Sequence, residues 1–478
     1  MDGAIFKKGM YINGGEIYSN DSFAVDNPAT LETIGYVPDG GRREAAMAVE
    51  AAHKAFLGWS KKTAYERSAL LENWFQVIAE RTEELARMIT LEQGKPLSEA
   101  RGEIAYANSF IKWFAEEAKR VYGETIPASS SSKRILVQKQ PVGVVAAITP
   151  WNFPAAMITR KVAPALAAGC TVVIKPAPAT PLTALLLAEC AHEAGIPAGV
   201  LNVVTTTDAA AVSDVWLDDS RVKKITFTGS TQVGKLLMEK AANTVKKVSL
   251  ELGGLAPFII AEDADIKAAV NGVMQSKFRN AGQTCVCANR IYVHENIKEP
   301  FIEAFKTALS SLRVGNGLEP STDIGPLINK AAIEKVKRQI DDAISKGAEA
   351  IKGPKAGEAK GFFIDPVILS GATDDMACMQ EETFGPVAPV SSFSDDAEAI
   401  RRANHTRYGL AAYVFTQSLQ KAFYYSENLE YGIVGVNDAL PATAQAPFGG
   451  IKESGLGREG SHHGMDEFLE IKYISMQL

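Results

Sequence analysis

The sequence has few cysteines and no long hydrophobic segment. Its five cysteines among 478 residues are too sparse, and odd in number, for the disulfide framework of a secreted protein, so they favour a reducing compartment. No apolar run reaches the roughly 18 residues that a membrane span needs, and residues 1–20 lack the basic and apolar regions of a signal peptide. We therefore expect a cytoplasmic protein that does not cross a membrane.

Positive charge and metal-ligand patterns are also missing. The net charge is −6, whereas a nucleic-acid-binding surface requires clustered Lys and Arg. Among the six histidines, His462 and His463 are adjacent, which suits no shared metal, and no Cys/His ligand spacing occurs. We expect neither a nucleic-acid partner nor a bound metal. The composition, 46% hydrophobic and 22% charged, is that of a globular protein with a large core.

Helical and strand patterns alternate along the chain. Helical spacing appears first, at residues 41–58, 64–93 and 99–121. Apolar strands then alternate with helices: we expect strands at 134–140, 142–148, 171–174, 200–204, 224–227 and 247–250, and helices at 155–168, 183–194, 208–217 and 233–242. Such alternation predicts a parallel α/β sheet, which binds ligands at the carboxyl ends of its strands. A second α/β set follows in 257–445, and the polar turn Ser129–Ser132 suggests a hairpin leaving the main body.

Two strand ends are candidates for nucleotide binding. In one, Gly229 and Gly234 lie in a turn between a strand and a helix, and free N–H groups at a helix start can hold phosphate. The spacing from Gly229 to Lys235 is close to that of a P-loop, although Leu236 stands where a P-loop needs Ser or Thr for magnesium. In the other, Lys175 ends a buried strand. An ordinary turn and a surface lysine are the structural alternatives.

Three residues suggest covalent chemistry. Cys285 follows small and amide residues in a turn, and it would be nucleophilic as a thiolate if N–H groups at a helix start lowered its pKa. Glu251 ends an apolar strand, where a carboxylate can serve as general base. Asn152 lies in a rigid turn between two prolines and could donate to an oxyanion. The alternatives are a core cysteine, a solvated charge and a turn-forming asparagine.

Read in order, seven strings resemble the NAD(P)-dependent aldehyde dehydrogenase superfamily over essentially the whole chain. One such string would be weak evidence, but seven in the right order are very specific. They are Pro150–Pro154, Lys175–Ala177, Phe227–Ser230, Glu251–Gly254, Gly282–Cys285, Glu382–Pro386 and Pro447–Gly450. The resemblance implies an enzyme that oxidises an aldehyde to a carboxylic acid, with NAD(P) as the hydride acceptor.

The resemblance also implies roles for matched residues. Cys285 would be the nucleophile, Glu251 the base that activates the deacylating water, and Asn152 with the Cys285 backbone N–H the oxyanion hole. Lys161 and Glu459 are similar to a pair thought to relay protons. Glu382 would hold the nicotinamide ribose. The full cofactor-binding set is Trp151, Lys175, Pro178, Gly229, Ser230, Gly234, Leu252, Glu382 and Phe384.

Within the superfamily, the chain looks most like the succinate-semialdehyde dehydrogenases. The supporting strings include Arg160 and Arg279, and two guanidinium groups near a reactive cysteine suit a substrate with a distal carboxylate. Thr443 and Phe448 complete the expected substrate set. Ala442 stands where that subfamily often has Ser, so glutarate semialdehyde or another ω-semialdehyde is an alternative substrate.

Cofactor preference and redox control rest on single residues. NAD-preferring relatives often carry Glu three residues after Lys175, where this chain has Pro178, so a 2′-phosphate meets no repulsion and NADP is expected to be preferred over NAD. Cys287 lies two residues from Cys285, and the pair could form a reversible disulfide if their Cα atoms come within about 7 Å. We have no functional account of Leu255, where the superfamily commonly has Asn.

The implied fold is α/β and aldehyde dehydrogenase-like, with three parts. A Rossmann-like cofactor domain would span 1–122 and 143–252, an α/β catalytic domain 253–450, and a β oligomerisation arm 123–142 and 451–478. The exposed strands of the arm imply a homodimer or homotetramer. Alternatives are a P-loop hydrolase or kinase, a non-catalytic structural relative, which would tend to lose its nucleophile, and a CoA-acylating enzyme, against which Glu251 argues.

Overall fold

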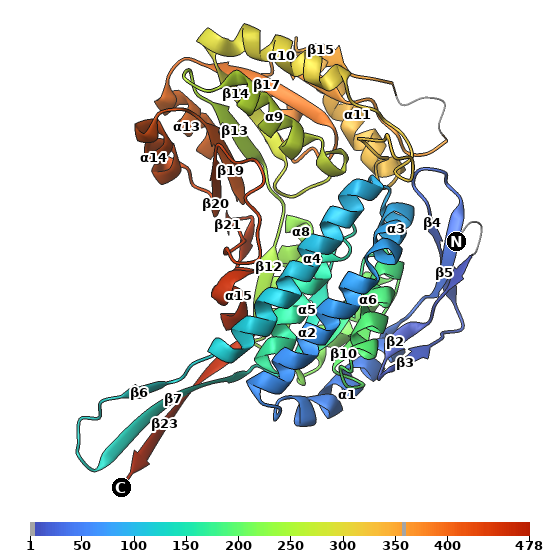
Figure 1. Cartoon of the computed structure of the whole chain (residues 1–478), viewed down its shortest axis with the longest axis vertical. Coiled ribbons are helices and arrows are strands. Elements are labelled where there is room, and N and C mark those ends of the chain that lie inside the picture. The colour runs from blue at the N-terminus through green and yellow to red at the C-terminus, as the bar shows by residue number, and fades with distance from the viewer. Residues whose placement is uncertain (1–4, 356–359) are drawn as a thin grey trace.

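The chain forms two α/β lobes, and a β arm projects from the lower one, away from the upper one (Figure 1). The computed structural model describes residues 5–355 and 360–478. The lower lobe contains an eight-stranded sheet in the order β22-β12-β11-β8-β9-β10-β2-β3. Its parallel strands are β8 (Val144–Ile148), β9 (Thr171–Lys175), β10 (Leu201–Val203), β11 (Val222–Thr228) and β12 (Lys247–Glu251). These strands are the five expected from the apolar runs between 142 and 250.

Helices cover both faces of this sheet. Along β8, Val145 and Ala147 pack into one core while Val144, Ala146 and Ile148 pack into the other, as the alternation of side chains along a strand requires. The helices that pack on the sheet are α1 (Arg42–Trp59), α5 (Ala156–Ala168), α6 (Pro181–Glu193), α7 (Ala209–Asp218) and α8 (Thr231–Ala242). An outer layer of α2 (Ala64–Glu80), α3 (Thr82–Gln93) and α4 (Leu97–Glu117) packs on α5 and α6.

The single helix expected over 64–93 is two helices. The chain leaves helical geometry at Arg81, which has φ −98° and ψ 17° and ends α2 while beginning α3. The Arg81 side chain pairs with Glu84 at 2.8 Å and with Glu189 of α6 at 3.6 Å. The apolar periodicity continues across the break because both helices pack on the same core, which is why the sequence pattern gave no sign of it.

The upper lobe contains a seven-stranded sheet in the order β15-β16-β17-β14-β13-β19-β20. All pairs are parallel except β15 with β16. Its strands are β13 (Ala256–Ile260), β14 (Ala288–His294), β15 (Glu349–Lys352), β16 (Val367–Ser370), β17 (Val387–Phe393), β19 (Ala411–Phe415) and β20 (Ile433–Val436). Its helices are α9 (Ile266–Lys277), α10 (Lys298–Ser310), α11 (Lys330–Ser345), α12 (Ala377–Gln380), α13 (Asp396–Asn404) and α14 (Leu419–Asn428).

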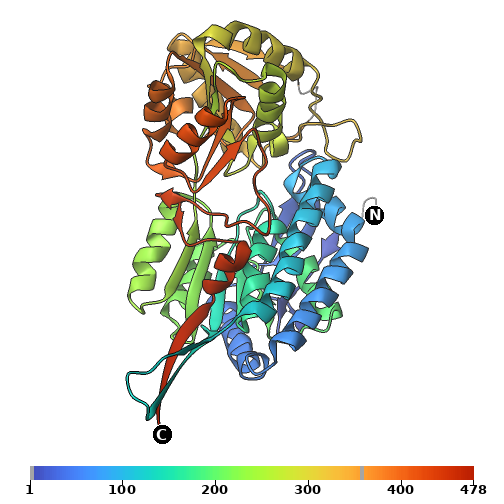
Figure 2. The ribbon, with the colours of Figure 1, turned by 60° about the vertical axis from the view of Figure 1, so that its left-hand side comes forward.

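The arm is a three-stranded antiparallel sheet in the order β23-β7-β6. β6 (Glu124–Ile126) and β7 (Lys133–Pro141) form the hairpin expected around Ser129–Ser132, and β23 (Leu469–Gln477) pairs with β7 over its whole length. Between the lobes runs the C-terminal segment, which Figure 2 shows in red.

Short elements of the C-terminal segment join other sheets. Of residues 451–478, β21 (Ile451–Lys452) pairs with β18 (Tyr408–Gly409), and β22 (Gly455–Leu456) joins the lower sheet. We therefore place the arm boundary at Leu469 rather than at 451. The remaining elements are β1 (Phe6–Lys7), β2 (Met10–Ile12), β3 (Gly15–Ile17), β4 (Ser22–Asp26), β5 (Thr33–Pro38) and α15 (Ser461–Asp466). Within the described ranges, no helix is long and apolar enough to cross a membrane.

Candidate active site

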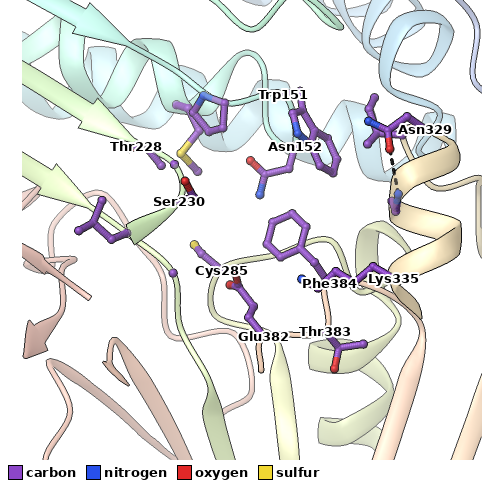
Figure 3. A pocket seen from close by; sticks show the side chains of 17 residues that line it. Trp151, Asn152, Thr228, Ser230, Cys285, Asn329, Lys335, Glu382, Thr383 and Phe384 are labelled. Atoms are coloured by element: carbon purple, nitrogen blue, oxygen red, sulfur yellow. Dashed lines mark hydrogen bonds between the residues drawn. The ribbon is translucent and has the colours of Figure 1, made fainter. Parts of the chain in front are cut away.

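A chamber of about 300 Å³ lies where the two lobes meet. The lower sheet contributes residues directly after β8, β11 and β12, and the upper lobe contributes the segments around Cys285 and Glu382. Figure 3 shows Trp151, Asn152, Ser230, Cys285, Glu382 and Phe384 around this space. The carboxyl ends of parallel strands therefore carry most of the residues expected at a ligand site.

A second chamber, of about 230 Å³, shares only Cys285 and Met157 with the first. It contains Arg160 and Arg279. The other residues that line it are Tyr106, Phe153, Thr284, Val286, Ala439, Leu440, Pro441, Ala442 and Phe448. The Cys285 side chain thus borders both chambers, so one ligand can approach the sulfur in each of them.

Cys285 lies in a turn that leads into β14, and no helix begins there. The expectation of a helix start that lowers the thiol pKa is therefore wrong. Burial instead raises the pKa of the Cys285 thiol to about 12, although Arg160 acts in the opposite direction. The sequence could not show whether Cys285 lies in a turn or at a helix start, because small and amide residues can precede either one.

Asn152 is buried and directs its amide into the first chamber (Figure 3). Its Nδ2 donates to the carbonyl oxygen of Gln283 at 3.0 Å, while its Oδ1 has no partner. The second hydrogen of Nδ2 is left for a ligand. Asn152 is therefore a donor beside the sulfur, which is the geometry that an oxyanion hole needs.

Glu251 is a buried carboxylate at the end of β12, and neither of its oxygens has a hydrogen-bond partner among the described residues. Burial first, and the nearby charge of Glu459 second, raise the pKa of Glu251 well above its usual value. A Cβ at Gly449 would lie 2.8 Å from Glu251 Oε1, so glycine at that position leaves room for the carboxylate. An unpartnered carboxylate with a raised pKa suits a general base.

Glu459 lies between two cations of α5. One carboxylate oxygen is 2.5 Å from Arg160 Nη2, and the other accepts a hydrogen bond from Lys161 Nζ. Burial alone would raise the pKa of Glu459, but Arg160 and Lys161 together lower it below its usual value. The structure thus brings Lys161 and Glu459 together, and it adds Arg160 to the same ion-pair cluster.

The residues expected to hold a cofactor fall into three groups. Trp151, Gly229, Ser230, Leu252, Glu382 and Phe384 line the first chamber. Gly234 lies in α8, where a Cβ would be 2.4 Å from Leu252 Cδ2. Lys175 is the last residue of β9 and Pro178 follows that strand, and both lie outside that lining. Lys175 is buried with its pKa lowered by desolvation to about 8, and Pro178 is exposed.

These residues fit a dinucleotide. The start of α8, capped by Ser230, faces the chamber with backbone N–H groups that can bind phosphate. The hydroxyls of Thr228 and Thr383 are buried at the chamber without partners, so a polar ligand can pair with them. Glu382 accepts from the Gly254 amide at 3.2 Å, and burial raises the pKa of Glu382 to about 7.

The substrate set needs one correction. Thr443, expected to contact a carboxylate, does not line the second chamber, because its hydroxyl pairs with Gln445. Phe448 does line it and lies 4.0 Å from the Arg160 guanidinium. Tyr106 of α4 and Phe153 also line it and were not foreseen; no local motif marks Tyr106, which comes from a distant part of the chain.

Cys287, the redox candidate, is buried. Its sulfur accepts a hydrogen bond from Lys277 Nζ at 3.4 Å, and burial raises its pKa. All five cysteines are unpaired.

Comparison with known proteins agrees with this geometry. Residues 17–474 match the Aldehyde dehydrogenase family. A mitochondrial succinate-semialdehyde dehydrogenase of Oryza sativa subsp. japonica is 56% identical, covering 96% of this chain and 87% of that protein. A glutarate-semialdehyde dehydrogenase of Pseudomonas putida is 54% identical, covering 100% and 99%. The crystal structure of an NADP-dependent enzyme of E. coli, 53% identical, superposes with a TM-score of 0.97 over 99% of this chain and 98% of that one. The expected fold is confirmed.

Proposed function

This chain belongs to the aldehyde dehydrogenase family, and on that premise we propose that it oxidises succinate semialdehyde to succinate. The observation that carries the proposal is Arg279 in the chamber beside Cys285. Among the residues that the structure describes, no carboxylate forms a salt bridge with Arg279, and its Nε is buried without a partner. A semialdehyde carries a carboxylate that can pair with this cation while its aldehyde reaches the sulfur.

The residues around Cys285 support a covalent mechanism. The Cys285 thiol gives its proton to the Glu251 carboxylate, and Lys161 and Glu459 carry that proton away so that Glu251 is ionised again. The sulfur attacks the aldehyde carbon, and the carbonyl oxygen becomes an oxyanion that Asn152 Nδ2 and the Cys285 N–H stabilise. A bound nicotinamide would supply the hydride acceptor. The resulting thioester is attacked by water whose proton Glu251 accepts, and the carboxylic acid leaves as the thiolate is restored. Lys161 and Glu459 then carry the proton from Glu251 toward solvent.

NADP is the cofactor that we propose to be preferred over NAD. The exposed Pro178 places no carboxylate near Lys175, and the ammonium of Lys175 can attract a 2′-phosphate. The similar NADP-dependent enzyme of E. coli supports this assignment. The exposed arm supports a homodimer or homotetramer, and five unpaired cysteines support a cytoplasmic location.

Glutarate semialdehyde is the second candidate substrate. The similarity to the Pseudomonas putida enzyme favours it, and so does Ala442, which leaves the second chamber without a hydroxyl at that position. A chain longer by one methylene would place the same carboxylate deeper along this chamber. The two substrates differ in length alone, so their relative kcat/KM reports the distance from Cys285 to the cation.

The test is the absorbance of reduced nicotinamide during turnover by purified protein. Succinate semialdehyde, glutarate semialdehyde and butanal are each supplied with NADP and, separately, with NAD. Fast turnover of succinate semialdehyde with NADP, slow turnover of butanal and none in Cys285→Ala are expected. A higher kcat/KM for glutarate semialdehyde would show that it, and not succinate semialdehyde, is the preferred substrate. Equal turnover of butanal would refute the carboxylate site. Faster reduction of NAD would overturn the cofactor preference.

A further inference from the structure

The loop before Cys285 has an unusual backbone. Asn280, Ala281 and Gly282 have φ values of 52°, 54° and 74°, three consecutive left-handed residues. This conformation is unfavourable for residues with a Cβ, and asparagine tolerates it better than most. At Gly282 a Cβ would lie 2.2 Å from the carbonyl oxygen of Gly385, so only glycine fits. Such a turn persists only where its surroundings hold it.

The Asn280 side chain joins this loop to the lower lobe. It is fully buried, and its Nδ2 donates to the carbonyl oxygen of Asn152 at 2.9 Å and to that of Gln283 at 3.2 Å. Asn152 follows β8 of the lower sheet, whereas Gln283 lies two residues before Cys285. One amide therefore bridges the two backbone segments that carry Asn152 and the sulfur.

The segment between α3 and α4 fixes the orientation of that amide. Gln93 Nε2 donates to Asn280 Oδ1 at 2.8 Å, and Gln93 Oε1 accepts from the Lys95 amide at 3.0 Å. Lys95 Nζ then donates to the Asn152 carbonyl at 2.8 Å and to Glu103 Oε2 at 2.6 Å. With its oxygen held by Gln93, Asn280 can only turn its NH₂ group toward the two carbonyls.

We propose that Asn280 is a positioning residue that sets the spacing between the two oxyanion donors, the Asn152 amide and the Cys285 N–H. The inference rests on the proposed function, in which these donors stabilise the oxyanion. The Asn152 amide itself donates to Gln283, so the carbonyls of Asn152 and Gln283 and the two amides form one closed set of hydrogen bonds. Without the Asn280 donors, both buried carbonyls lose a partner and the spacing is no longer fixed.

The matched substitution is Asn280→Asp. Aspartate has the same shape, tolerates left-handed backbone and keeps an oxygen for Gln93, but it cannot donate to the two carbonyls. We expect kcat for the semialdehyde to fall about 100-fold, the size of losing one oxyanion donor. We expect little change in KM, which depends on Arg279, and none in the rate at which iodoacetamide alkylates Cys285, because alkylation forms no oxyanion.

A control separates this role from loss of stability. Asn202 in β10 is also fully buried, and its Nδ2 likewise donates to two backbone carbonyls, those of Val172 at 3.2 Å and Gly199 at 2.7 Å. Asn202→Asp removes the same kind of donor pair outside both chambers. If Asn280 acts by positioning, Asn202→Asp is expected to lower the melting temperature and to leave kcat unchanged. An equal fall in kcat in both variants would overturn the proposal.

A double-mutant cycle tests whether Asn280 acts through Asn152. In Asn152→Ala, the further change Asn280→Asp is expected to lower kcat by less than about twofold, because the donor to be positioned is gone. Additive effects, or slower alkylation of Cys285, would overturn the proposal. An unchanged kcat in Asn152→Ala alone would refute the oxyanion role in the proposed function. If Asn280→Asp does not fold, Gln93→Glu is tested instead. Gln93→Glu keeps the acceptor for the Lys95 amide and removes only the donor to Asn280.

Discussion

The Arg160 guanidinium and the Glu459 carboxylate are ion-paired at 2.5 Å, and Lys161 binds the other oxygen of the same carboxylate. Arg160 was expected only to bind substrate, yet it already forms an ion pair in the free protein, with a carboxylate that it shares with Lys161. Among the described residues, Arg279 has no such partner. The two arginines of the second chamber are therefore not equivalent. Arg160 contacts Glu459, and the charge of Glu459 helps to set the pKa of Glu251, so the ion-pair cluster on α5 connects the substrate chamber with the general base.

Glu459→Gln is expected to move the acidic limb of the kcat profile to lower pH. The negative charge of Glu459 helps to raise the pKa of Glu251, whereas Arg160 and Lys161 lower it. Removing that charge lowers the pKa of Glu251, so the base stays ionised at lower pH. The measurement is kcat against pH with succinate semialdehyde. Glu50→Gln, in a surface ion pair with Arg221, is the control that leaves the limb in place.

Arg279→Leu is expected to raise KM for succinate semialdehyde by about 10- to 100-fold, the worth of a charge-assisted hydrogen bond. KM for butanal should not change, because butanal has no carboxylate to lose its partner. Arg279→Lys keeps the charge without the planar fork and should recover part of the effect. A parallel rise of KM for both aldehydes would show that Arg279 shapes the chamber rather than binding the carboxylate.

Cys287→Ala is expected to make peroxide inactivation irreversible. One peroxide can convert the Cys285 and Cys287 thiols to a disulfide with release of two waters, and a dithiol reverses this step. Cys287 must first leave Lys277, which binds its sulfur at 3.4 Å. Recovery of activity after dithiol treatment is compared between the wild type and the variant. Equal recovery in the two proteins would rule out the switch.

Lysine substitutions at Ile471 and Tyr473 are expected to dissociate the homo-oligomer that we propose. These residues lie two apart on one face of β23, with exposed fractions of 72% and 62% in the single chain. Burying the added charges against a partner is unfavourable, so the mass measured by light scattering should fall to that of one chain. Leu57→Lys, at an equally exposed position on α1 (62%), is the matched control. An unchanged mass would place the assembly surface elsewhere.

Much of the fold follows from local patterns in the sequence. β8 and β9 are wholly buried, and apolar residues make up all of β8 and the middle of β9. α5 ends at Gly169, whose φ of 97° suits glycine alone among common residues. The turn motifs likewise bring Cys285, Asn152 and Glu251 to the region between the lobes. Helix ends inside a continuous apolar pattern, such as Arg81, leave no comparable signal.

The contacts that hold the site residues in place could not be predicted from the sequence. Gln93 bonds Asn280, 187 residues further along the chain, and Tyr106 reaches the second chamber from α4. Pairings of this kind depend on how the lobes pack, not on spacing along the chain. The same is true of the Arg160–Glu459 ion pair, because each residue taken alone also suits a surface charge.

Cys285 stands at the boundary between two chambers that have only Met157 otherwise in common. In the function that we propose, the sulfur lies between a chamber for the nucleotide and a chamber for the aldehyde. Because each reactant would bind in its own chamber, neither would block the binding of the other, and either could bind first. An unreactive dicarboxylate that occupies the second chamber, beside the two arginines, is therefore expected to compete with the aldehyde. It is not expected to compete with the nucleotide.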